Sequence, residues 1–143
     1  MKLNLSIAQP ELAGYVNVDV TKHSIDLANL DNICESSECT DVIVNDLLKF
    51  VSYEQLPLVV KHLTDKLRHH GKITFIFTDV NSIIREYNSG HVDEKMLNQL
   101  LFTQGAHSCF SYEYIKRIIG AVKLTLLSID INKEQVVIVA ERP

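Results

Sequence analysis

Residues 42–78, VIVNDLLKFVSYEQLPLVVKHLTDKLRHHGKITFIFT, decide the fold class, because they predict a strand, a helix and a second strand in turn. Val42-Ile43-Val44 is an uninterrupted apolar run, which suits a strand covered on both faces, as in a parallel sheet. The helix is predicted by five apolar residues that share one helical face, namely Leu56, Val59, Val60, Leu63 and Leu67. The β-branched and aromatic residues of Lys72–Thr78 favour the second strand.

Residues at both ends of this segment predict where the helix begins and where it ends. Ser52 followed by Gln55 resembles a capping box, whereas Pro57 is best placed at the first helical position. The helix therefore begins near Pro57, or a turn precedes it. Arg68, His69 and His70 crowd the predicted last turn, where cations favour the helix dipole, and Gly71 predicts the stop.

Flanking segments extend the alternation of strands and helices. Strands are predicted at Leu3–Ile7, Tyr15–Val20, Ile25–Leu27, Val122–Ile131 and Gln135–Ala140, and the polar stretch Asn29–Thr40 is predicted to be a loop. Helices are predicted at Asn81–Tyr87, at Asp93–Phe102, and after a Ser111 cap up to Gly120. Asn132-Lys133-Glu134 is short enough for an antiparallel hairpin. We therefore expect one α/β domain over residues 1–143, with a mostly parallel sheet.

Composition and charge exclude several functional classes. The chain has 143 residues and a formal net charge of -4 without a basic cluster, so we expect no nucleic-acid binding. No apolar stretch approaches the roughly 20 residues of a membrane span, and no signal peptide is evident. The three cysteines are expected to be reduced thiols of a cytoplasmic protein.

The cysteines also raise the question of a metal site. Cys34 and Cys39 are close in the sequence, but structural zinc needs four ligands, so Cys109 and His107 would have to join them through folding. We expect no metal, and we expect Cys109 to be buried and inert.

The order of short motifs resembles one enzyme family. Leu3–Ala8 (LNLSIA) and Gly14–Asp19 (GYVNVD) resemble the opening of small class I S-adenosylmethionine-dependent methyltransferases, where L-N-L-G-C-G precedes G-Y-x-N-V-D. Further matches follow in the same order over nearly the whole chain, at Asp26-Leu27, Asn45–Val51 (similar to N-H-V-L-E-H-V), Leu67–Ile73 (similar to L-K-P-G-G-K-L) and Gly105–Phe110 (similar to G-x-x-x-H-x-x-x-F).

This resemblance implies a Rossmann-like methyltransferase fold with a C-terminal antiparallel hairpin. Residues Gln9–Gly14 are too short for a full crossover helix, so spacing alone favours an antiparallel pair of first strands. The resemblance instead implies parallel strands with a truncated crossover.

The resemblance also implies S-adenosylmethionine as cofactor and a set of residues near it. These are Ser6 and Ala8 at the family's glycines, Asp19 at the ribose hydroxyls, Asp26 at the adenine amino group, and Leu27, Asn45 and Asp46 along the pocket. The glycines let the family's backbone approach the cofactor closely, and Ser6 and Ala8 each add a Cβ there. Further departures are Asp46 in place of a histidine, Lys49 in place of a glutamate and His70 in place of a glycine.

Each candidate has a structural alternative. Asp19 could be a solvated or helix-capping residue, and Asp26 could serve a turn. Asn45 or Asp46 could cap the next turn. His107 is the weak candidate for a catalytic general base, against a loop histidine that packs on the last helix.

The sequence is therefore compatible with two alternative functions. The first is a methyltransferase that acts on a small-molecule or sugar-like acceptor. The second is a non-catalytic binding or assembly module that keeps the fold, has lost the cofactor site and binds a protein partner. A homodimer through an unpaired edge strand or through the helix Asp93–Phe102 is compatible with either function.

Overall fold

The computed structural model describes residues 1–6, 11–19, 27–102 and 105–143. The strands are β1 (Lys2–Ser6), β2 (Val16–Asp19), β3 (Cys39–Asn45), β4 (Leu67–Thr78), β5 (Thr125–Asn132) and β6 (Gln135–Glu141). The helices are α1 (Leu27–Ile33), α2 (Leu56–Lys66), α3 (Val80–Asn88), α4 (Glu94–Leu101) and α5 (Tyr112–Ala121), with 3-10 turns at Leu48–Phe50 and Tyr53–Gln55.

The strands form one six-stranded sheet in the order β2-β1-β3-β4-β6-β5. β1, β2, β3 and β4 are parallel, while β6 runs antiparallel to both β4 and β5. The predicted mixed sheet and its C-terminal hairpin are confirmed. The parallel pairing of β1 with β2 agrees with the family resemblance and contradicts the expectation from linker length alone.

The side chain of Asn17 organises the described part of the short β1–β2 connection. Its Oδ1 accepts hydrogen bonds from Asn4 Nδ2 at 2.9 Å and from the Leu12 amide at 3.0 Å. Its Nδ2 donates to the carbonyl oxygens of Leu12 and Tyr15, each at 3.1 Å. Gly14, with φ of 82°, makes the turn between them. One amide side chain thus satisfies backbone groups that a crossover helix would satisfy internally.

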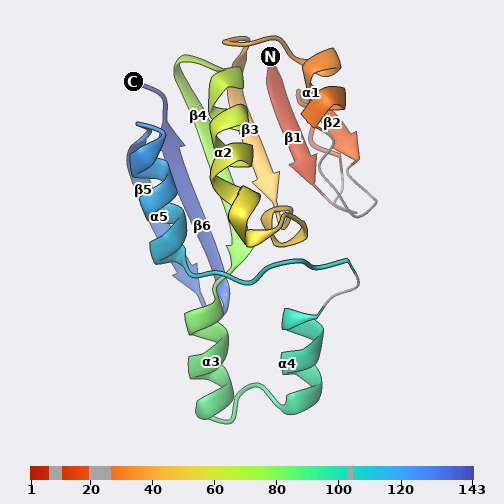
Figure 1. Cartoon of the computed structure of the whole chain (residues 1–143), viewed down its shortest axis with the longest axis vertical. Helices are drawn as coiled ribbons and strands as arrows, with labels where there is room; N and C mark the ends of the chain where they lie inside the picture. Colours follow the sequence, from red (N-terminus) through yellow and green to blue (C-terminus); the bar gives the residue numbers. More distant parts are fainter. Residues whose placement is uncertain (7–10, 20–26, 103–104) are drawn as a thin grey trace.

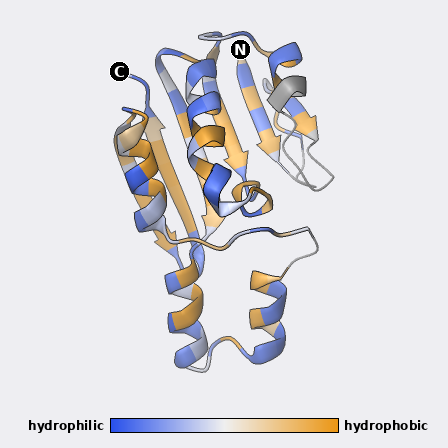
Figure 2. Cartoon of the chain, viewed as in Figure 1, coloured by the Kyte–Doolittle hydropathy of each residue, from blue (hydrophilic) through white to orange (hydrophobic). Residues whose placement is uncertain are grey.

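One face of the sheet carries the hydrophobic core. Alternate residues of the four central strands point to it, namely Leu3, Leu5, Val42, Val44, Ile73, Phe75, Phe77, Val136, Ile138 and Ala140. α1, α2 and α5 lie side by side over this face (Figure 1), and their apolar sides contribute Leu30, Leu63 and Ile115 among others. The outward sides of these helices are largely hydrophilic (Figure 2). Each such buried side chain contributes roughly 1.5–3 kcal/mol of transfer free energy.

The opposite face of the sheet is different, and it corrects the expectation for the β3 segment. Val42 and Val44 are buried under the helices, but Ile43 points away from them and is half-buried. Of the described helices, α1, α2 and α5 all cover the other face (Figure 1). The apolar run at Val42–Val44 therefore belongs to a strand that these helices cover on one face only.

The segment before β3 is the largest error of the sequence-based prediction. Leu27, predicted at the end of a strand, is the first residue of α1, and residues 25 and 26 lie outside the described part. The predicted loop Asn29–Thr40 contains most of α1 and the start of β3. Leu30 and Cys34, spaced by one helical turn, are buried in the core. Polar neighbours concealed this short amphipathic pattern.

The ends of α2 also differ from the prediction. The Ser52 side chain makes no capping hydrogen bond, so the capping box is wrong, whereas Pro57 does lie in the first turn and a 3-10 turn precedes the helix. α2 ends at Lys66, and Gly71 lies inside β4. A Cβ at Gly71 would come within 2.8 Å of the Cys39 carbonyl oxygen. Gly71 therefore allows a close approach of two strands instead of stopping a helix.

The remaining helices follow the prediction closely. α3 and α4 cover the two predicted helices and extend as an arm beyond the carboxyl end of β4 (Figure 1). Ser111 caps α5, because its Oγ accepts a hydrogen bond from the Tyr114 amide. None of the helices in the described ranges is long and apolar enough to cross a membrane.

Candidate functional site

The carboxyl ends of the parallel strands bring three of the predicted residues into one row. Ser6 ends β1 and is paired in register with Asp19, the last residue of β2. On its other side Ser6 is paired with Asn45, the last residue of β3. Neighbouring strands lie about 4.8 Å apart, so the backbones of these three residues span less than about 10 Å. Ligands of open α/β sheets bind outside this edge.

Ser6 and Asn45 differ in how far they are open to the edge. Ser6 is 6% exposed, so its side chain is enclosed by its surroundings. Asn45 is half-buried and lies on the same face of the sheet as Ser6. An accessible amide at the end of β3, beside the end of β1, can donate and accept hydrogen bonds with a polar ligand.

Asp46 leaves the sheet through a strained backbone conformation. Its φ is 55°, and its amide donates to the Ile76 carbonyl oxygen at 2.8 Å. Its Oδ2 lies 2.9 Å from Lys49 Nζ, in an ion pair whose lysine side chain is only 20% exposed. The cap position before the following turn, Leu48–Phe50, is held by Leu47, which makes no side-chain capping hydrogen bond. The alternative that Asn45 or Asp46 caps this turn is therefore wrong.

His107 joins this edge from far along the chain. Its amide donates to the Lys49 carbonyl oxygen at 2.8 Å, and the amide of Ser108 donates to the same oxygen at 3.1 Å. The His107 side chain is exposed. In Figure 1 the segment that leads into α5 crosses below the carboxyl ends of β3 and β4. The predicted histidine and the predicted pocket residues thus lie on one side of the molecule.

The structure does not describe two of the predicted site residues. Ala8 and Asp26 lie outside the described residues. Leu27 is the first residue of α1, which follows β2 in the chain. The amino-acid end and the adenine end of the predicted cofactor site therefore stay predictions.

Asp79 is a residue that the sequence analysis missed. It follows β4 at the same edge and is fully buried. Its Oδ2 accepts from the amide and hydroxyl of Ser82, each at 2.8 Å, and its Oδ1 accepts from the Tyr112 amide at 2.7 Å. One carboxylate thereby fixes the first turns of both α3 and α5. An aspartate followed three residues later by serine at a strand end was the available signal.

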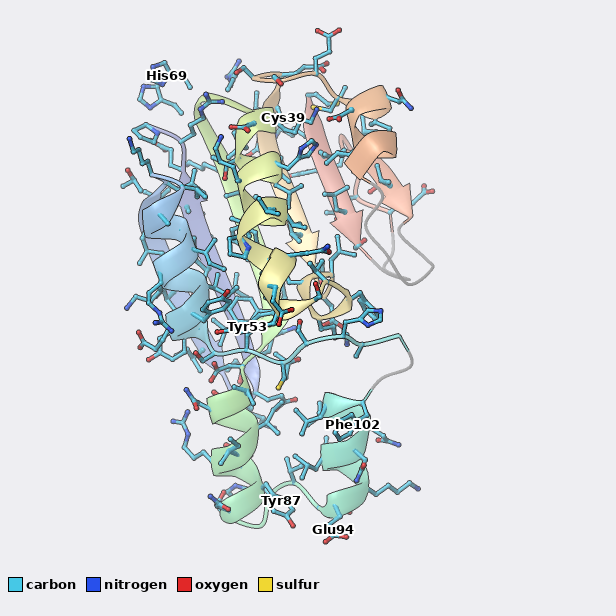
Figure 3. All side chains as sticks on the ribbon, in the orientation of Figure 1. Cys39, Tyr53, His69, Tyr87, Glu94 and Phe102 are labelled. Carbon is cyan, nitrogen blue, oxygen red and sulfur yellow. The ribbon has the colours of Figure 1, made fainter. Side chains whose placement is uncertain are left out.

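Cys34 and Cys39 lie at the opposite edge of the sheet. Figure 3 labels Cys39 near the amino ends of the strands, and its Sγ lies 2.7 Å from Cys34 Sγ. Burial raises the pKa of the Cys39 thiol to about 12 and also raises the pKa of Cys34. Cys109 is exposed, so its predicted burial is wrong; it precedes α5 in a connecting segment and no packing covers it. Within the described ranges, no cluster of three or more His, Cys, Asp or Glu side chains could hold a metal ion.

His69 and His70 do not end a helix, contrary to the prediction. Both lie in β4, and their rings stack with centroids 5.3 Å apart. His70 has φ of 58°, in the left-handed region that favours glycine. Its place in the sequence is the one where the resembling family has a glycine. A glycine at this position would adopt the same backbone conformation with less strain than His70 does.

Solved structures of methyltransferases share this fold. An O-methyltransferase family protein from Burkholderia thailandensis matches 90% of this chain with a TM-score of 0.62 and 12% identity. The chain has a methyltransferase-like fold. A SAM-dependent methyltransferase from Archaeoglobus fulgidus matches 90% of the chain with a TM-score of 0.61 and 11% identity. The magnesium protoporphyrin IX methyltransferase from Synechocystis PCC 6803, solved with bound SAH, matches 89% with a TM-score of 0.56 and 14% identity.

This chain is shorter than the chains of these solved structures. The chain covers 36% of the Burkholderia chain, 52% of the Synechocystis chain and 76% of the Archaeoglobus chain. No protein-family model and no curated protein sequence matches it. At these identities the similarity shows the fold.

Proposed function

We propose that this domain binds S-adenosylmethionine at the carboxyl edge of β1, β2 and β3 and aligns a small-molecule acceptor for methyl transfer. The observation that carries the proposal is the register that sets Ser6, Asp19 and Asn45 in one row. The proposal is supported by neighbours named as SAM-dependent methyltransferases, one of them with bound SAH. We place this activity in the cytoplasm, in line with the free cysteines.

The described residues fit part of such a ligand. Asp19 ends β2 where a carboxylate can accept hydrogen bonds from ribose hydroxyls, as in dinucleotide sites. Asn45 offers an amide at the end of β3, on the other side of Ser6. We assign the adenine end to Asp26 and Leu27. We assign the amino-acid end to Ser6 and Ala8, which each carry a Cβ that the glycines of the resembling family lack.

The chemistry asked of the protein is mainly alignment. Bound S-adenosylmethionine supplies the methyl group on a sulfonium, and holding an acceptor in line with it supplies much of the rate enhancement. His107 is the residue that we assign to accept the acceptor's proton, because its exposed side chain lies on the segment held against Lys49.

A second function is favoured by the departures at the same edge. Ser6 is nearly enclosed, and the Lys49–Asp46 ion pair occupies positions where the resembling family has glutamate and histidine. These features favour a non-catalytic binding or assembly module that keeps the methyltransferase-like fold. The two functions differ in whether S-adenosylmethionine binds at all.

Calorimetric titration with S-adenosylmethionine and S-adenosylhomocysteine distinguishes the methyltransferase from the non-catalytic module. We expect saturable binding at micromolar ligand, abolished in Asp19→Ala and kept in the matched control Asp130→Ala, whose carboxylate is exposed on β5. The glycine-restoring variant Ser6→Gly/Ala8→Gly should bind several-fold more tightly, because it removes two Cβ atoms. An absence of heat from folded wild-type protein at millimolar ligand would contradict the proposal and favour the binding module.

A further inference from the structure

The face of the sheet opposite the helices carries an apolar patch. Ile43 on β3, Ile76 on β4, and Val137 and Val139 on β6 are half-buried and do not belong to the core. The register places them side by side around Thr74, which is paired with both Ile43 and Val139, while Ile76 is paired with Val137. We call these five residues the open face.

Within the described ranges, the segment Leu12–Tyr15 covers this side of the sheet beside the open face and leaves the open face itself uncovered. Asn4 and Asn17 point to the same side as Ile43 by register, and Asn17 holds Leu12 there. Lys2 Nζ lies 5.6 Å from the centre of the Tyr15 ring on that side. This part of the chain lies over β1 and β2. On the same side of β4 and β6, none of the described helices is present, because α2 and α5 lie over the other face (Figure 1).

A contiguous β-branched surface of this kind is typical of an interface. Two such sheets can pack face to face about 10 Å apart, with their strands within about 30° of each other. The patch lies on hydrogen-bonded strands of the sheet, so its association requires no rearrangement of the core.

The charges beside the open face indicate what covers it. Lys72 on β4 is paired in register with Glu141 on β6, and both point to this side at one end of the patch. Glu141 also lies 3.3 Å from His70 Nδ1. A two-fold axis parallel to the strands and midway between β4 and β6 sets Lys72 against the partner subunit's Glu141, and the reverse.

The same axis matches the apolar residues. It sets Ile76 against the partner subunit's Val137 and Thr74 against the partner subunit's Val139. An axis centred on β4 would instead oppose two copies of Lys72, and an axis centred on β6 would oppose two copies of Glu141. Like charges across an interface are unfavourable. Asp41 on β3 is also paired with Lys72, so an axis midway between β3 and β4 would oppose unlike charges too. That axis would set Ile76 against the partner subunit's Asn45, so the apolar contacts favour the axis between β4 and β6.

We infer that the open face binds a second copy of this chain, in a symmetric dimer whose two sheets pack face to face about this axis. The partner is a second copy because one patch supplies both halves of the charge complementarity, as a two-fold contact requires. The open face shares no residue with the row at the carboxyl edge, although its Ile76 is paired in register with Asn45 of that row.

Sedimentation equilibrium over a concentration series tests the dimer. We expect the wild-type chain to dimerise, and Ile76→Lys to weaken dimerisation at least about tenfold, because it places a charge in the apolar contact. Ile84→Lys is the matched control, because Ile84 is 50% exposed on α3 and away from the sheet. A monomeric wild-type chain, or equal effects of both variants, would overturn the inference.

Charge reversal gives a sharper test that does not depend on apolar packing. Lys72→Glu and Glu141→Lys should each weaken their own dimer at least about tenfold. When the two variants are mixed, each interface contact again joins opposite charges, so a heterodimer should form with near wild-type affinity. A mixture that stays as monomeric as its components, or single variants that dimerise like the wild type, would overturn the proposed axis.

Discussion

Ile73 and Ile76 lie on the same strand, β4, but on opposite faces of the sheet. Ile73 is fully buried under the helices, and Ile76 is half-buried on the open face. The two faces are similar in sequence, because both are rich in β-branched residues. What differs is the covering: helices lie over one face, and a short segment lies over part of the other. Hydrophobicity along a strand therefore shows that a face can be buried, while the connections decide which face the same chain buries.

The largest expected effect contrasts these two isoleucines. Ile73→Ala should lower the free energy of unfolding by about 3 kcal/mol, because it removes buried methyl groups and leaves a cavity. Ile76→Ala should cost about 1 kcal/mol or less in the monomer. Urea unfolding at protein concentrations where the chain is monomeric measures both. Equal losses would show that the open face is covered within the monomer.

The next effect concerns how the helices are held on the covered face. Asp79→Ala should cost about 2 kcal/mol, because the buried amides of Ser82 and Tyr112 lose their acceptor. Asp93→Ala is the matched control, an exposed helix cap that accepts from the Met96 amide and should cost about 1 kcal/mol. Thermal unfolding of both variants compares them, and an Asp79 variant no less stable than the Asp93 variant would contradict the assigned role.

The smallest effect is absent at neutral pH and concerns the buried thiols. In the unfolded chain Cys34 and Cys39 ionise near 9.0, and burial raises both pKa values in the folded state. Their contribution to stability is therefore complete below about pH 9 and is lost as the pH rises towards the folded pKa of Cys39, about 12. Each thiol adds a slope of at most about 1.4 kcal/mol per pH unit.

Urea unfolding between about pH 8 and about pH 10.5 measures this slope. Cys34→Ala/Cys39→Ala should flatten it, and Cys109→Ser should leave it unchanged. Tyr112 and Tyr114, whose pKa values are also raised, contribute equally to all three proteins. The same slope in all three would show that the two thiols are not the cause.

The sequence predicted the long elements because their signals are local. The apolar periodicity of α2, the β-branched run of β4 and the Ser111 cap each depend on neighbours in the chain. α1 was missed because only a few apolar positions mark it among polar ones. Gly71 was misread because its reason, the close approach of Cys39, is a contact between distant residues.

The candidate site also has a part that local signals predict and a part that depends on contacts between distant residues. The edge row of Ser6, Asp19 and Asn45 was predictable, since carboxyl ends of parallel strands meet at one edge. The approach of His107 to Lys49, across a large sequence separation, could be expected only from the family resemblance. The open face depends on which side each connection takes, which the sequence pattern does not encode locally.

The central claim, that the carboxyl edge of β1, β2 and β3 binds S-adenosylmethionine, is tested most directly by nuclear magnetic resonance. Amide shifts of labelled protein would be followed during titration with S-adenosylhomocysteine. The account predicts saturable shifts concentrated at Ser6, Asp19 and Asn45, with the thiol pair at the opposite edge unaffected. Spectra unchanged at millimolar ligand, or shifts confined to another part of the surface, would contradict it.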